Sequence, residues 1–278
     1  MDNKNKRQKN AVRDPFGRGL GCKSYVYTLL SITGVLAFFL VWQLLVETGL
    51  LEQRYLEKPT KIIALFFSKL TVKEPDGATL LQHIWASLSV SLTGLFMAIV
   101  VGLPLGSLMG WYKGLDKFMR PIFEIVRPIP PVSWIPLTIL WLGIGLQAKA
   151  FVIFFAAFIP CVINSYTGVK MTRQSLINVA KTCGCSKFEI FRKVCIPSAL
   201  PMMFAGIRVA LGNAWATLVA AEMLASTAGL GYMITMGRNF ARPDLIVLGM
   251  CTIGGIGAIF NGLFNVIEKN VIKWRVGA

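Results

Sequence analysis

Six long apolar runs constrain the fold of this chain more than any other feature of its sequence. A bilayer core about 30 Å thick needs roughly 20 apolar residues for a helix to cross it, and each run approaches that length with few charges. Lipid offers the backbone no hydrogen bonds, and the runs lack the short alternation of barrel strands. The sequence therefore predicts an all-α, polytopic membrane protein with spans near residues 25–48, 86–110, 124–145, 149–169, 202–225 and 246–267.

The basic residues indicate how these spans are oriented. The net charge of +16 at first invites a nucleic-acid partner. Most of the 29 lysines and arginines, however, would lie on one side of a six-span protein, in segments 4–23, 111–120, 170–193 and 269–275. By the positive-inside bias that side is cytoplasmic. We therefore expect both termini and a turn at 111–120 in the cytoplasm, and no nucleic-acid partner.

The chain divides into a short lead and one membrane domain. Residues 1–24 form a basic cytoplasmic N-terminal segment, in which residues 1–20 are expected to be disordered. Residues 25–278 form the transmembrane domain, and the first span is too long for a cleaved signal. The extracytoplasmic segment 52–85 contains "KIIALFFSKL", which predicts a short interfacial helix.

Small residues at every fourth position predict close packing of three spans. Such a ridge lets two helix backbones approach each other in lipid. Whether each ridge faces the same chain or a second copy stays open, with the same chain preferred. The ridges are Gly94, Ala98, Gly102, Gly106 and Gly110; Gly206, Ala210 and Ala214; and Gly254, Ala258 and Gly262.

The stretch "RPIPPVSWIP", residues 127–136, predicts a break in the third span. Broken spans often line a transport path, although a kink that only fits neighbouring helices is an equal alternative. The candidate path residues are Pro130, Pro131, Trp134, Asn213 and Glu222.

Four charged residues near or inside the spans need an explanation, because such groups are expensive in lipid. Arg208 and Glu222 lie within about 40° of one face of the fifth span, so both could face one cavity, or Arg208 could extend to the interface. Glu124 and Arg127 are one turn apart and are expected to form a local pair at the cytoplasmic end of the third span.

The sequence does not support a metal site or a nucleotide-binding loop. Cys183, Cys185 and Cys195 lack the paired spacing of a zinc site, and His83 is predicted on the opposite side of the membrane. "GRGLGCKS", residues 17–24, has no glycine before its lysine and so does not fit a phosphate loop. We expect no metal, no cofactor and no catalytic residue.

Residues 178–197, "NVAKTCGCSKFEIFRKVCIP", predict a bent pair of short helices. A first helix stops at Gly184, and a second begins with Ser186 and Glu189 as a capping box. Pro197 is expected to end it. An amphipathic segment of this kind binds lipid or a groove on another protein, and two aromatic anchors, Phe188 and Phe191, favour the groove.

The same loop carries a family resemblance. The order A-x3-G-x9-[IV]-x-[LI]-P, at Ala180, Gly184, Val194, Ile196 and Pro197, resembles the EAA loop of bacterial ABC-importer permeases. From about residue 80 onward the chain is similar to the nitrate, sulfonate and taurine branch of that family. The motifs are "RPIPPVSWIPL", "LWLGIG", "IPSALPMMFAGIRVALGNAW" and "VAAEMLASTAGLGYMI".

The resemblance implies a type I ABC-importer permease fold, with its core at about 80–268. It also implies a second permease copy, a pair of cytoplasmic ATPase subunits and an extracytoplasmic solute-binding protein. The glutamate usual at the first loop position is Asn178 here, so a salt bridge from that position is lost. The implied ATPase-coupling residues are Asn178, Val179, Ala180, Gly184, Ser186, Phe188, Glu189, Phe191, Val194, Ile196 and Pro197.

The sequence thus predicts the permease subunit of an ATP-driven importer in the bacterial cytoplasmic (inner) membrane, with ATP hydrolysed by a partner. The implied solute is a small sulfonate-, taurine- or nitrate-like anion. An ion-driven secondary carrier and a membrane anchor without transport are the alternatives. A carrier would show paired broken segments and buried carboxylates, whereas only one broken span and one promising acid are present.

Overall fold

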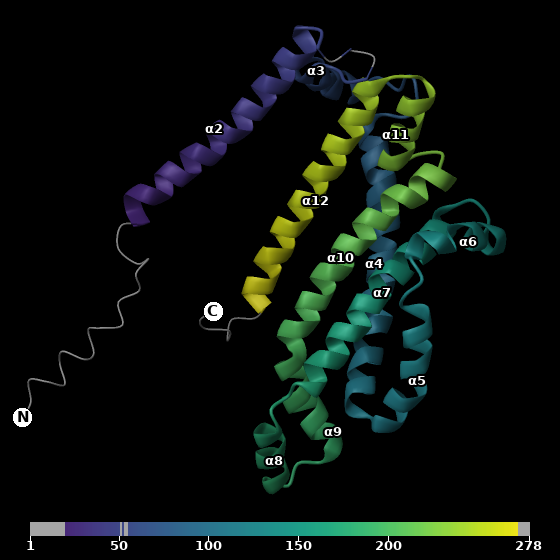
Figure 1. The fold of residues 1–278 in the computed structure, drawn as a ribbon. Coiled ribbons are helices and arrows are strands. Elements are labelled where there is room, and N and C mark those ends of the chain that lie inside the picture. The colour runs from purple at the N-terminus through teal and green to yellow at the C-terminus, as the bar shows by residue number, and fades with distance from the viewer. Residues whose placement is uncertain (1–19, 51, 53–54, 272–278) are drawn as a thin grey trace, which may run out of the picture. The chain divides into compact units, whose positions relative to one another are not determined.

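The protein is an assembly of helices. The computed structural model describes residues 20–50, 52 and 55–271, and every regular element within these ranges is helical (Figure 1). Residues 1–19, where a disordered lead was predicted, lie outside the described part. By contacts the chain divides into two compact units, residues 1–61 and 62–278. Five described helices are long and apolar enough to cross a membrane, and one bent pair raises the number to six.

The first unit is dominated by α2 (Leu20–Glu47), in agreement with the predicted first span. Its side chains from Leu29 onward are mostly exposed, and Phe38, Phe39 and Trp42 contact one another. An apolar helix without protein cover fits a lipid environment. The predicted short helix is present as α3 (Pro59–Lys69), which continues into the second unit.

The second unit is built around three long helices, α4 (Leu80–Trp111), α7 (Leu146–Lys170) and α10 (Ile196–Ala225). They correspond to the second, fourth and fifth predicted spans. Thr79 caps α4 and forms a capping box with Gln82. The core between the three helices consists of Val90, Leu95, Ala98, Ile153, Ala157, Cys161, Ala210, Ala214 and Leu218.

The small-residue ridge of α4 packs against α7 of the same chain. A Cβ at Gly94 would lie 2.7 Å from the Ala150 carbonyl oxygen, and one at Gly106 would overlap the Val162 carbonyl oxygen. Gly206 on α10 meets α7 at Asn164, where a Cβ would lie 2.6 Å from the Asn164 Cβ. Two of the three ridges are therefore intramolecular seams.

The third ridge differs. It lies on α12 (Pro243–Val271), the predicted sixth span. A Cβ at Gly254 or Gly262 would meet no atom within 4 Å, and Ala258 is exposed. Within the described residues this ridge has no packing partner.

The third predicted span is broken more completely than a single helix at 124–145 would allow. It consists of α5 (Lys113–Val126), the 3₁₀ turn η1 (Pro131–Trp134) and α6 (Ile135–Leu142), bent by 86°. The turn expected at 111–120 is present but is confined to Tyr112, between the end of α4 and the start of α5, and residues 113–120 are already helical. Prolines at 128, 130 and 131 explain why α5 stops where it does.

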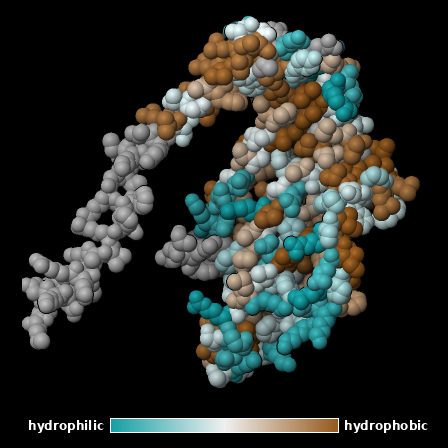
Figure 2. Space-filling model, viewed as in Figure 1, coloured by the Kyte–Doolittle hydropathy of each residue, from teal (hydrophilic) through white to brown (hydrophobic). Residues whose placement is uncertain are grey.

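The remaining elements join α7 to α10 and α10 to α12. They are α8 (Gln174–Thr182), α9 (Lys187–Ile190), the π-helical turn η2 (Phe191–Cys195) and α11 (Leu230–Asn239). Figure 2 shows hydrophilic side chains over the end of the second unit that carries α8 and α9. This is the end where the basic residues were expected to face the cytoplasm.

Candidate functional site

The loop between α7 and α10 has the predicted bent form. Gly184 ends the first helix with a φ of +77°, and the Cys185 N–H donates to the Ala180 carbonyl at 3.1 Å. Only glycine adopts this left-handed backbone readily. Ser186 and Glu189 form the capping box: the Ser186 N–H donates to the Glu189 carboxylate at 3.0 Å, and Ser186 Oγ accepts from the Glu189 N–H at 3.3 Å.

The end of this segment differs from the prediction. Pro197 does not end the helix but lies in the first turn of α10. The reason is the turn η2 before it, in which the Ile196 N–H donates to the Phe191 carbonyl, five residues back. This wider turn makes room for the proline ring and its missing donor. The short helix α9 is thereby continuous with the 30-residue helix α10.

The two aromatic anchors point to different surroundings. Phe188 is 62% exposed, as is Val179 on α8. Phe191 instead packs against Trp111 of α4, with ring centroids 5.7 Å apart. The prediction that both rings are free to bind a partner is therefore wrong for Phe191, because η2 turns it toward the bundle.

The other loop residues divide in the same way. Asn178 is exposed and its side chain accepts from Gln174 at 3.1 Å. Val194 and Ile196 pack with the buried cluster of Val169, Ile190, Cys195, Ala199 and Met203. One face of the segment is thus anchored on the bundle, and the other carries exposed apolar and polar groups.

The broken span carries three of the predicted path residues. Pro130 and Pro131 open the turn η1, and Pro130 is exposed. Trp134 stacks on Phe155 of α7 at 4.9 Å, and its indole N–H has no partner among the described residues. Asn213 is exposed on α10, a separate helix from the one that carries these three.

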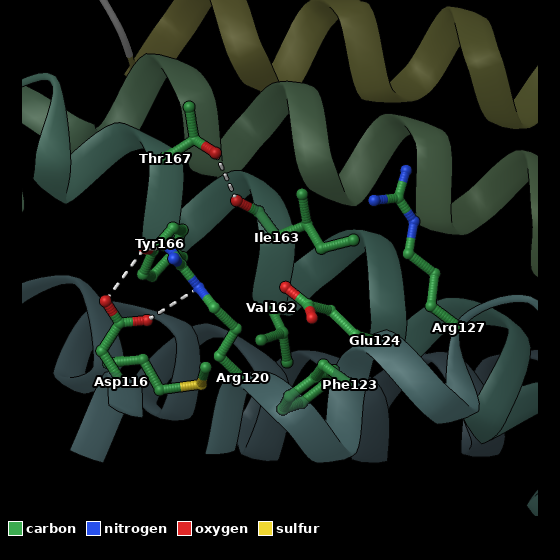
Figure 3. A pocket seen from close by; sticks show the side chains of 10 residues that line it. Asp116, Arg120, Phe123, Glu124, Arg127, Val162, Ile163, Tyr166 and Thr167 are labelled. Atoms are coloured by element: carbon green, nitrogen blue, oxygen red, sulfur yellow. Dashed lines mark hydrogen bonds and ion pairs between the residues drawn. The ribbon is translucent and has the colours of Figure 1, made fainter. Parts of the chain in front are cut away.

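Before the break, α5 and α7, with Met109 of α4, line a half-open cavity of about 200 Å³, shown in Figure 3. At one end Asp116 binds Lys170 at 3.0 Å and accepts from the Tyr166 hydroxyl at 3.1 Å. Arg120 lies 3.6 Å from the Asp116 carboxylate and also donates to Tyr166. Asp116 thus faces two cations. The cavity is lined by Met109, Asp116, Arg120, Phe123, Glu124, Arg127, Val162, Ile163, Tyr166 and Thr167.

The expected pair of Glu124 and Arg127 does not form. In the part of the chain that the structure describes, neither side chain makes an ion pair or a hydrogen bond, and Figure 3 shows the two groups pointing apart. Arg127 is also not at the start of the third span as predicted, because α5 already begins at Lys113 and ends just before it. Phe123 contacts Phe158 at 5.8 Å, and Trp134 contacts Phe155, so the chain between them runs beside the middle turns of α7.

Glu222 lies near the C-terminal end of α10, far from the α8–α9 loop, and is 1% exposed. Both of its oxygens accept from Ser87 Oγ of α4, at 2.8 and 2.9 Å, and one accepts from the Gly231 N–H at 2.9 Å. A Cβ at Gly229 would collide with this carboxylate. Glu222 thus joins α4, α10 and the start of α11 rather than facing an open cavity.

Arg208 and Glu222 do not share a cavity. Arg208 pairs with Glu268 and donates to Asn265, both on α12. Both partners come from another helix. Sequence spacing along α10 placed the two charges on one face but gave no information about what covers each end.

Sequence reasoning missed a buried polar cluster beside Glu222. Lys69 pairs with Asp76, whose second oxygen lies 3.1 Å from His83 Nε2, and all three side chains are at most 1% exposed. His83 Nδ1 accepts from the Gly229 N–H at 3.0 Å. Burial tends to raise the pKa of Asp76, but hydrogen bonds from His83 and Lys69 outweigh it and lower this pKa. The only signal in the sequence was a histidine and a serine one turn apart, at 83 and 87.

Comparison with known proteins gives these features a family. Residues 98–273 match the family described as the binding-protein-dependent transport system inner membrane component. The chain is 33% identical to the taurine transport system permease protein TauC of Escherichia coli (strain K12), over 88% of this chain and 90% of the relative. It is 31% identical to the nitrate import permease protein NrtB of Leptolyngbya laminosa, over 87% and 88%.

Two further comparisons agree. The putative aliphatic sulfonates transport permease protein SsuC of Bacillus subtilis (strain 168) is 29% identical, over 84% of this chain and 83% of the relative. A chain of the MetNI methionine ABC transporter, solved in inward facing conformations, matches the fold with a TM-score of 0.58 at 22% identity, covering 70% of this chain and 94% of that one. The chain belongs to the binding-protein-dependent transport system inner membrane component family and is the membrane-spanning permease subunit of an ABC importer.

Proposed function

We propose that this permease forms the translocation path for a small oxyanion, such as a sulfonate, taurine or nitrate. The observation that carries the proposal is the similarity to permeases named for taurine, aliphatic sulfonates and nitrate, which extends over 84–88% of the chain. Taurine, aliphatic sulfonates and nitrate differ in the rest of the molecule but all carry an oxyanion.

The segment from α8 to the start of α10 is proposed as the contact with a cytoplasmic ATPase, which hydrolyses the ATP. Phe188, Val179 and Asn178 are exposed on it and are suited to enter a groove. Ala180, Phe191, Val194 and Ile196 support the segment from the bundle side. Gly184, Ser186 and Glu189 fix its bend, and Pro197 lies where it joins α10.

The path itself is proposed to run along the broken span. Pro130, Pro131 and Trp134 give that span irregular backbone, which survives at membrane depth only beside protein or water. Asn213 on α10 is proposed as a further lining residue. Glu222 is proposed to serve the path indirectly, because its burial with Ser87 suits a group that positions the helices around it.

The family implies partners at both ends: an ATPase and a binding protein that delivers the solute. We propose in addition that two copies of this chain pair, that both termini are cytoplasmic, and that residues 1–24 and 25–278 act as lead and transmembrane domain. The basic end around α8 and α9 supports this orientation.

Uptake by reconstituted vesicles tests the proposal. The permease, its ATPase and its binding protein are incorporated together, and uptake of taurine, ethanesulfonate and nitrate is measured with ATP enclosed on the ATPase side. We expect uptake of at least one of these oxyanions that requires ATP and persists when ion gradients are collapsed by ionophores. Uptake that stops with the gradients would identify an ion-driven carrier, and co-purification with the ATPase without any uptake would identify an anchor.

A further inference from the structure

Arg127 is an exposed charged side chain at the end of α5, in a span that is apolar enough to cross a membrane together with α6. Its neighbours along the chain, Phe123 and Trp134, contact Phe158 and Phe155 in the middle turns of α7. An arginine at the centre of a bilayer costs about 2.5–3.5 kcal/mol even on insertion scales, so such residues face a partner or a watery path.

Glu124 presents an opposite charge to the same cavity, one helical turn away. The two residues line the space between α5 and α7 together, yet they do not pair, and within the described ranges no other group forms an ion pair or a hydrogen bond with either. Figure 3 shows the carboxylate and the guanidinium directed apart. A pair one turn apart is worth only about 0.2–0.5 kcal/mol, so both charges remain available to a ligand that binds them more strongly.

The other charges of this cavity show the contrast. Asp116, Arg120, Tyr166 and Lys170 are bound to one another by ion pairs and hydrogen bonds. Glu124 and Arg127, at the other end, form no ion pair or hydrogen bond within the described residues, although Glu124 feels the charge of Arg120. At about 200 Å³ the cavity is smaller than a site for a drug-sized ligand, of roughly 300–1,000 Å³, and suits a solute of few atoms.

We propose that Glu124 and Arg127 form a two-charge binding point for a small zwitterion, with the oxyanion of the solute on Arg127 and its ammonium group on Glu124. The inference rests on the proposed function, import of a small oxyanion, and narrows the solute to one that carries both charges. Taurine is a zwitterion of this kind, whereas nitrate and ethanesulfonate carry no ammonium group.

Taurine uptake by the complete transporter tests the proposal. Arg127→Gln and Glu124→Gln each remove one charge with little change in size, and each is expected to lower taurine uptake at least about tenfold, since a hydrogen bond to a charged group is worth about 1.5–3 kcal/mol. Arg127→Lys and Glu124→Asp keep the charges and are expected to retain more uptake. Lys117→Gln, which removes a charge of the same helix outside the cavity lining, is the matched control and is expected to transport at the wild-type rate.

Assembly is measured in parallel, as recovery of the complex and as its ATPase activity without solute. Wild-type uptake by either neutral variant would overturn the proposal, as would equal loss in the neutral and charge-retaining variants of intact complexes. If a neutral variant does not assemble, the KM for taurine is measured in Arg127→Lys and Glu124→Asp instead. It is expected to rise in both variants. An unchanged KM would overturn the proposal.

The failure of this inference is distinguishable from failure of the proposed function. A wild-type complex that imports nitrate or ethanesulfonate with ATP, but not taurine, leaves oxyanion import standing and overturns the zwitterion site. A complex that imports none of the three removes the proposed function itself. In a complex that carries both taurine and ethanesulfonate, Glu124→Gln is expected to impair taurine more, and an equal effect on both would overturn the role of Glu124.

Discussion

Asp76 is held between Lys69 and His83 in a site from which water is excluded. All three side chains are at most 1% exposed, and the cluster ties α3 and the following loop to the first turn of α4. Taking charges out of water is expensive, so each member of such a cluster is stable only while its partner is present. Through its Gly229 contact, His83 also connects this cluster to the start of α11.

The first prediction follows from this dependence. Asp76→Asn is expected to lower the free energy of unfolding by about 3–5 kcal/mol, because the Lys69 ammonium stays buried without a counter-charge. Thermal denaturation of the purified transporter in detergent measures the loss. Asp116→Asn is the control: its partners Lys170 and Arg120 are 46% and 52% exposed, so its loss should be clearly smaller. Equal losses would contradict the role given to burial.

The lowered pKa of Asp76 also predicts a pH dependence. Because this pKa is below its ordinary value of 3.8, the carboxylate stabilises the fold fully above that value. Its contribution is lost as pH falls through the lowered pKa of the folded state. The difference in stability between the wild type and Asp76→Asn should therefore shrink below pH 3.8, and melting curves of both proteins across that range measure it. If the difference in stability between the two proteins grew on acidification, the pKa of Asp76 would be raised in the folded state rather than lowered.

At the scale of elements, the bend at Gly184 sets the direction of α9 relative to α8. The left-handed backbone there is followed directly by the Ser186 cap, so the segment has no flexible linker within it. Such geometry suits a rigid contact with a moving partner. It is a local feature, carried by residues between Ala180 and Glu189.

Gly184→Val is expected to impair coupling. A β-branched residue in left-handed backbone costs roughly 1–2 kcal/mol, so the bend should open or shift. Solute-stimulated ATP hydrolysis and uptake should both fall, while the amount of permease in the membrane stays near normal. Gly114→Val is the matched control, because that glycine has no positive φ and a Cβ added there would meet no atom within 4 Å. Wild-type uptake and solute-stimulated ATP hydrolysis in Gly184→Val would show that the bend is not needed for coupling.

The elements show which parts of the fold are readable from sequence. Apolar runs and small-residue ridges predicted the long helices and the seam at Gly106, since both depend on residues near in the chain. The capping box at Ser186 was predicted for the same reason. The turn η2 and the position of Phe191 were not predicted, because the π-helical turn depends both on Pro197 and on the packing of Phe191 against Trp111.

The candidate site was readable only in part. The proline-rich break was predicted, but the separation of Glu124 from Arg127 depends on α7, which follows later in the chain. The bond from Ser87 to Glu222 joins residues 135 positions apart. Spacing rules act within one helix, and no such rule indicates which helix will cover a buried charge.

At the scale of the whole molecule, the two ends of the second unit differ in character. One end carries the buried cluster of Lys69, Asp76 and His83, and the other carries α8 and α9 under a hydrophilic surface (Figure 2). The proposed orientation places the second end in the cytoplasm. Cys183, which is exposed there, provides a native reporter.

Labelling of Cys183 is expected only from the cytoplasmic side. With the other five cysteines replaced, a membrane-impermeant maleimide should modify inside-out vesicles and leave right-side-out vesicles unlabelled. Bound ATPase subunits should slow the reaction, because Cys183 adjoins the proposed contact. A cysteine at Thr71 in the same background serves as the opposite control. Labelling of Cys183 from outside would reverse the orientation.

The junction at η2 determines where force can be absorbed. Since α9 passes into α10 without an intervening loop, a push on the exposed end of α9 reaches the 30-residue helix directly, and the rod can bend only at the π-helical turn and at Pro201. The far tip of that rod holds Glu222 against Ser87. A displacement of α9 would thus be felt at the opposite tip of α10, where Glu222 accepts from Ser87 and from the Gly231 N–H.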